Sequence, residues 1–212
     1  MRPEPPTSIT LPFTVVTDSR EQAPWKFTET FRHYVTRSGI RVKRKRKQID
    51  QGPPYRFVGM TRRVNDVYLP LIVPLLNGVT LKSGDYSIRG YESRVTIERK
   101  SRGDWLSSIT HDRPRFEREM ERFAEFDYAA VVIESDRRGI DEAQARVSLA
   151  ASDGTIAAWS VRFGVHFFLL GTRRDAEVFT LKLLEKFWER AERERKEREE
   201  REFIEGLADS LA

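Results

Sequence analysis

The chain has 212 residues, enough for one substantial hydrophobic core but too few for two large domains. With 39% hydrophobic and 33% charged residues and no long apolar run, the composition excludes a membrane span, and the absence of cysteine excludes disulfides and thiolate metal sites. The formal net charge of +5 favours a polyanionic partner without requiring one.

The N-terminal part divides into a tail, a strand and an insertion. Residues 1–12 are proline-rich and lack the apolar stretch of a secretory signal, so we expect an intracellular protein, cytoplasmic or associated with the nucleoid. The β-branched run Phe13–Thr17 predicts a buried strand that ends in a polar turn. From about 36 to 67 the pattern weakens, and we interpret this stretch as an inserted basic hairpin or loop. Its most basic residues are Arg41, Lys43, Arg44, Lys45, Arg46 and Lys47.

The middle of the chain predicts a helix followed by short strands. Tyr68–Leu76 is interpreted as helical despite two prolines, and 79–81 and 86–88 as strands separated by a bend at Gly84-Asp85. In Arg94–Glu98 the apolar residues alternate with polar ones. Because side chains alternate between the faces of a strand, Glu98 and Lys100 are predicted to lie side by side.

The C-terminal half alternates helices with strands. Residues 112–126 have helical spacing, 128–133 predict a central strand, 155–163 a helix capped at Ser152-Asp153, and 165–170 another strand. Asp175 is predicted to cap a long helix, whose charged extension covers 189–212. The order predicts an α/β fold with a mixed central sheet flanked by helices.

Two acids and a lysine form the candidate catalytic constellation. Phosphodiester hydrolysis needs a cation, an activated water and a donor to the attacked phosphate. Mg²⁺ takes oxygen ligands and usually only one or two carboxylates, which Asp85 and Glu98 supply. Lys100, two residues after Glu98, is placed to hold or polarise the attacking water. Three such residues also occur by chance as solvated strand-end charges, so the surrounding sequence decides between the two interpretations.

That surrounding sequence resembles the G-D-Y…E-R-K-S-x-x-D signature of the XPF-type structure-specific nucleases, which have a restriction-endonuclease-like core. The similarity spans roughly residues 13–188, which we take as a nuclease domain interrupted by the basic insertion. The matching segments are Thr17–Glu21, Gly84–Tyr86, Ile97–Ser101 with Asp104, Trp105–Ile109 with Arg115-Phe116, and Val131–Glu134.

The resemblance assigns roles residue by residue. It implies that Asp85 and Glu98 bind Mg²⁺, for which Mn²⁺ substitutes, and that Lys100 positions the water. Arg99 would contact phosphate or brace the site. The further acidic members around the metal would be Asp18, Glu21 and Asp104, and the further DNA contacts would be Arg20, Arg115 and the basic run of residues 41–47.

Several of these residues have simpler interpretations. Asp18 and Asp104 suit helix or turn caps, Arg20 suits a salt bridge with a neighbouring acid, and Arg115 suits a solvated helix surface. The basic run could also be a nuclear-import-like or solvated charge run, but a neighbouring nuclease core favours DNA contact. The chain departs from the family in having no helix-hairpin-helix pair after Trp188 and in having Glu119 at a frequent glutamine position.

The function expected from these patterns is metal-dependent cleavage of branched or distorted DNA in replication, repair or recombination. The resemblance also implies a homodimer, and we expect its surfaces on the helices at 155–163 and 173–188. Two alternatives stay open: a non-catalytic DNA-binding or scaffold subunit of a nuclease pair, and a sequence-specific restriction-type endonuclease.

Overall fold

The computed structural model describes residues 9–27, 31–33, 56–58, 61–64, 67–141 and 147–211. A six-stranded mixed sheet forms the centre, in the order β11-β10-β9-β8-β2-β7. Strands β9, β10 and β11 are parallel, β8 is antiparallel to both of its neighbours, and β7 is parallel to β2. The strands are β2 (Val15–Asp18), β7 (Leu75–Val79), β8 (Tyr86–Ile88), β9 (Val95–Ser101), β10 (Tyr128–Glu134) and β11 (His166–Leu169).

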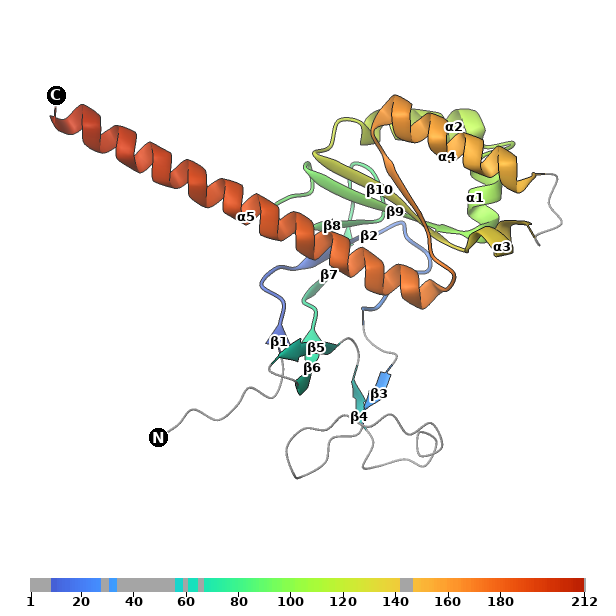
Figure 1. The fold of residues 1–212 in the computed structure, drawn as a ribbon, viewed down its shortest axis with the longest axis horizontal. Helices are drawn as coiled ribbons and strands as arrows, with labels where there is room; N and C mark the ends of the chain where they lie inside the picture. Colours follow the sequence, from blue (N-terminus) through green and yellow to red (C-terminus); the bar gives the residue numbers. More distant parts are fainter. Residues whose placement is uncertain are drawn as a thin grey trace.

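Helices cover both faces of this sheet (Figure 1). The long helix α5 (Arg173–Leu211) crosses one face, and its C-terminal half projects beyond the sheet. On the other face lie α1 (Arg102–Ser108), α2 (Arg113–Phe123) and α4 (Leu149–Phe163), with the short α3 (Arg137–Asp141) at the strand ends. The predicted α/β fold with a mixed sheet between helices is confirmed.

The central strand β10 explains how this layering arises from the sequence. Its apolar residues alternate between two separate clusters of buried side chains. Ala130 and Val132 pack in the cluster that includes α5, whereas Val131 and Ile133 pack in the cluster built on α1, α2 and α4. Because both faces are buried, a continuous apolar run is required here, and the sequence has one.

Two small sheets lie outside the main one. One has the order β1-β6-β5, from Ile9–Thr10, Val67–Ile72 and Thr61–Val64, and the other pairs β3 (Phe31–His33) with β4 (Arg56–Val58) in antiparallel register. Strands β4 and β5 lie within the predicted insertion, and each pairs with a strand at or beyond its boundary, β4 with β3 and β5 with β6. The basic run from Arg41 to Lys47 lies outside the described residues.

Several predicted elements were wrong in type or extent. The helix at 68–76 is instead β6 and β7, because prolines at 70 and 74 interrupt helical hydrogen bonding and both segments pair with other strands. Of the strand expected at 79–81, only Val79 lies in a strand, as the last residue of β7. Helix α4 begins at Leu149, with Ser148 as its N-cap, rather than after Ser152-Asp153.

The C-terminal helix also differs in detail from the prediction. Asp175 lies in the first turn of α5, and its backbone N–H donates to Thr172 Oγ1 instead of Asp175 acting as the cap. The helix runs unbroken through the predicted extension to Leu211. The ion pairs four residues apart along this helix that involve described residues, such as Arg195–Glu199, have arginine before glutamate. Within the described ranges, no helix is long and apolar enough to cross a lipid bilayer.

Candidate active site

A glycine-dependent bend places the first acid of the predicted constellation. Gly84 has a φ of +74°, and a Cβ built on it would meet Thr96 Oγ1 at 2.0 Å, so only glycine fits this close approach between the bend and β9. The backbone of the next residue is then fixed on both sides. The N–H of Asp85 donates to Ile97 O at 2.9 Å, and its carbonyl accepts from Asp18 N at 2.8 Å. Asp85 is thereby held at the start of β8, beside β9.

Strand β9 places the second acid and the lysine on one face, as the alternation predicted. Lys100 Nζ lies 2.6 Å from Glu98 Oε1, and both side chains are largely buried. The ammonium group also lies 4.5 Å from the centroid of the Phe116 ring, contributed by α2. Val95 and Ile97 point the other way, into the core beside α5. The core therefore anchors the strand that presents Glu98 and Lys100.

Burial and mutual repulsion dominate the electrostatics of the three groups. Burial raises the pKa of Asp85 well above its ordinary value, and the charge of Glu98 raises it further. Burial raises the pKa of Glu98 to about 7, partly opposed by Lys100 and reinforced by Glu119. For Lys100, burial lowers the pKa, but Glu98 outweighs this and the net pKa is raised. The site thus holds a protonated lysine beside two acids that repel each other.

This arrangement suits a hard divalent cation. Two buried carboxylates that repel each other are stabilised when a positive ion binds between them, and Mg²⁺ needs only one or two protein carboxylates. Among the residues that the structure describes, no three His, Asp or Glu side chains converge as a ligand group. Asp85 and Glu98 are therefore the two carboxylates of the constellation that could hold such an ion.

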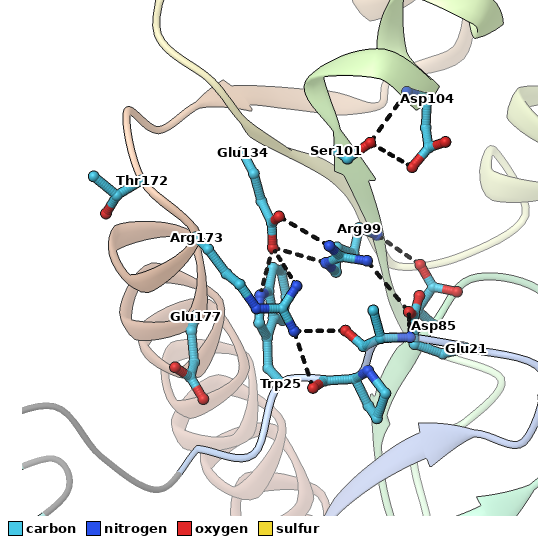
Figure 2. Close-up of polar contacts among 12 residues, drawn as sticks. Glu21, Trp25, Asp85, Arg99, Ser101, Asp104, Glu134, Thr172, Arg173 and Glu177 are labelled. Atoms are coloured by element: carbon cyan, nitrogen blue, oxygen red, sulfur yellow. Dashed lines mark hydrogen bonds and ion pairs between the residues drawn. The ribbon is translucent and has the colours of Figure 1, made fainter.

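Arg99 lies between Glu98 and Lys100 in sequence, but its side chain makes a different set of contacts (Figure 2). Its guanidinium donates to both oxygens of Glu134, at 2.7 and 2.9 Å, and to Glu21 Oε1 at 3.3 Å. Its backbone N–H donates to Asp85 Oδ2 at 2.8 Å. The side chain of Arg99 is only 10% exposed, and these contacts fix its position between Glu134 and Glu21.

Sequence reasoning missed two members of this cluster. Glu134, at the end of β10, also accepts from Trp25 Nε1 at 2.9 Å and from Arg173 Nη1 at 3.1 Å. Arg173 Nη2 in turn donates to the carbonyls of Ala23 and Pro24. An acid that ends an otherwise apolar buried strand was the available signal for Glu134. For Arg173, one of many charges on its helix, the sequence carried no comparable signal.

Asp18 and Arg20 pair with each other. Asp18 accepts from the backbone N–H and the guanidinium of Arg20 and from Leu81 N, at distances of 2.7–2.9 Å. Burial raises the pKa of Asp18, but these hydrogen bonds outweigh it and the net pKa is lowered. The geometry matches the simpler interpretation of both residues, a turn cap and a salt bridge with a neighbouring acid.

A cleft of about 180 Å³ opens beside Lys100. Asp104 lies on its rim and exchanges two hydrogen bonds with Ser101, the N-cap of α1, so the helix-cap interpretation fits its geometry (Figure 2). Arg115 also lines the cleft, with its side chain exposed. The remaining lining residues are Ser107, Ser108, Asp112, Phe116 and Glu119. The structure therefore brings Arg115 and Asp104 to the site from two different helices.

Fold and site together define a mixed α/β protein with an Asp–Glu–Lys constellation at the junction of β8 and β9, in which Glu98 is buried and Asp85 and Lys100 are partly buried. No protein-family model matches the chain, and no curated protein matches its sequence. Among solved structures, the chain is similar to XPF from Aeropyrum pernix, with 18% identity and a TM-score of 0.45 over 53% of this chain and 54% of that chain. A second structure, XPF from Aeropyrum pernix in complex with DNA, has 17% identity and a TM-score of 0.45 over 56% and 55%. The chain thus spans about half the length of each of these two proteins.

Proposed function

We propose that this chain is an endonuclease that hydrolyses phosphodiester bonds in DNA with the help of Mg²⁺, for which Mn²⁺ substitutes. The observation that carries the proposal is the contact of 2.6 Å between Lys100 Nζ and Glu98 Oε1, next to the buried carboxylate of Asp85. The reaction requires two acids, a lysine and access for the substrate, and the cleft that Lys100 lines supplies the access.

Each group has a defined task in this reaction. Asp85 and Glu98 would hold the metal ion, which when bound neutralises phosphate charge and favours ionisation of a water near neutral pH. Lys100 keeps its proton because Glu98 raises its pKa, and its Nζ holds the attacking water and stabilises the charge that develops on the phosphate. Arg115, exposed on the rim of the cleft, contacts the neighbouring backbone phosphate.

The proposed substrate is branched or distorted DNA, cleaved during replication, repair or recombination. The basic run of residues 41–47 would add phosphate contacts, and such contacts make affinity strongly dependent on salt. A second copy of the chain would pair through the nuclease domain. Val161 on α4, whose side chain is 89% exposed, lies on one of the two expected surfaces.

A panel of labelled flaps, forks, four-way junctions, single strands and plain duplexes, incubated with Mg²⁺, tests the proposal. We expect cleavage of at least one branched substrate by the parent chain and none by the Asp85→Asn variant. Cutting of plain duplex at one short sequence would support a restriction-type enzyme instead. Binding without any cutting would support a non-catalytic subunit, and sedimentation that shows only monomer at micromolar concentration would contradict the homodimer.

A further inference from the structure

The cluster around Arg99 contains an imbalance that bears on the metal site. Arg99 contacts two acids, but its contact with Glu134 is bidentate, at 2.7 and 2.9 Å, whereas Glu21 receives a single contact at 3.3 Å. Bidentate arginine–carboxylate pairs are the stronger and more directional kind. Glu134 is therefore the principal partner of the guanidinium, and Glu21 is paired with it only loosely.

Glu21 lies close enough to the catalytic acids for its charge to act on them. Arg99 contacts both Asp85, through its backbone N–H at 2.8 Å, and Glu21, through its guanidinium at 3.3 Å. After burial and the charge of Glu98, the charge of Glu21 also raises the pKa of Asp85. Both of its hydrogen bonds use one oxygen, Oε1, which accepts from Ala23 N and from Arg99. Figure 2 shows Arg99 between Glu134 on one side and Glu21 with Asp85 on the other. A guanidinium released by Glu134 would thus have Glu21 as its remaining carboxylate partner.

We propose that Glu134 is a positioning residue that limits the pairing of Arg99 with Glu21 to one long contact, so that the negative charge of Glu21 acts on a divalent ion held by Asp85 and Glu98. This inference rests on the proposed function, to whose metal site it adds Glu21 and Glu134 as charged groups around the ligand pair Asp85 and Glu98. Trp25 Nε1 and Arg173 Nη1 both donate to Glu134, and these contacts fix the position of the carboxylate that pairs with Arg99. Loss of a group that orients a metal site in this way typically weakens metal binding by about 10–100-fold.

A double-mutant cycle separates this role from a general structural one. Binding of Mn²⁺ to the intact, DNA-free protein is measured by calorimetry for the parent, Glu134→Gln, Glu21→Gln and the double variant. Each single substitution is expected to raise the Kd for Mn²⁺ about 10-fold, because loss of an outer group typically costs about 10–100-fold in metal affinity. In the Glu21→Gln background, Glu134→Gln should change the Kd less than about twofold, because the charge that it protects is already gone.

Glu117→Gln is the matched control, because Glu117 also accepts from a tryptophan Nε1, that of Trp159, and pairs with an arginine, Arg113. It should leave the Kd for Mn²⁺ unchanged. If Glu134→Gln does not fold, Arg99→Met/Glu134→Gln removes both buried partners and is expected to bind Mn²⁺ within about threefold of the parent.

The inference is overturned by additive effects of the two single substitutions, by an unchanged Kd in Glu134→Gln, or by weak binding in Arg99→Met/Glu134→Gln. It is equally overturned if the parent shows no Mn²⁺ binding that depends on Asp85. DNA cleavage is scored separately. A chain that binds Mn²⁺ as described but cuts no DNA would contradict the proposed function and leave this inference standing.

Discussion

Replacing Gly84 with alanine should destabilise the protein more than an ordinary glycine-to-alanine change at a turn. The position has a φ of +74°, and the new Cβ would lie 2.0 Å from Thr96 Oγ1 and 3.2 Å from the carbonyl oxygen of Ile97. The left-handed backbone alone costs about 1–2 kcal/mol for a residue with a Cβ. Moving the Thr96 hydroxyl also breaks its buried hydrogen bond of 2.8 Å to Ser83 O, which adds about 1–3 kcal/mol.

The total loss expected for Gly84→Ala is therefore about 2–5 kcal/mol in the free energy of unfolding, measured by urea denaturation. Gly90→Ala is the matched control, because Gly90 has a φ of +86° but no heavy atom lies within 4 Å of the place that its new Cβ would occupy. That control should lose only the backbone cost of about 1–2 kcal/mol. Equal losses at the two positions would refute the argument that β9 and the bend approach each other so closely.

Three further predictions concern buried polar groups. Asp85 has a raised pKa, so its ionisation costs stability as the pH rises above the pKa of the unfolded state. The metal-free Asp85→Asn variant should therefore have a higher Tm than the parent at pH 8 and lose that advantage near pH 4. A Tm advantage that did not depend on pH would count against this reasoning. Asp18 has a lowered pKa, so its charge should stabilise the fold above about pH 4 and lose this effect as the pH falls further. The difference in the free energy of unfolding between the parent and Asp18→Asn, measured by urea denaturation, should therefore narrow between pH 7 and pH 3. Tyr86→Phe removes the acceptor of the Trp25 backbone N–H, at 2.6 Å and buried, and should cost about 1–3 kcal/mol in the same assay; an unchanged midpoint would mean that this N–H finds another acceptor.

The local features of the site were predictable because they depend on neighbouring residues. Alternation along 94–100 requires only that the segment be a strand, and this put Glu98 and Lys100 on one face. The bend at Gly84-Asp85 likewise follows from a glycine between two β-like segments. Both predictions used spacing over a few residues, where the geometry of the backbone leaves few alternatives.

The features that were missed depend on contacts between distant segments. Residues 67–79 form a nearly continuous apolar run whose periodicity does not separate a helix from a strand, and pairing with β1, β2 and β5 decides the outcome. The bidentate contact between Arg99 and Glu134 joins residues 35 positions apart, and Arg173 reaches Glu134 across 39 positions. Which of many arginines meets which of many acids is set by the packing of β9, β10 and α5.

The central claim is that Asp85, Glu98 and Lys100 act together on a phosphodiester bond. The most direct measurement is the single-turnover rate of cleavage of a labelled branched DNA in Mg²⁺, for Asp85→Asn, Glu98→Gln and Lys100→Ala variants that remain folded. We predict a loss of at least about 100-fold in each, against an unchanged rate for Lys82→Ala, which removes an exposed lysine paired with Glu125. Cleavage by all three variants at the rate of the parent chain would contradict the claim.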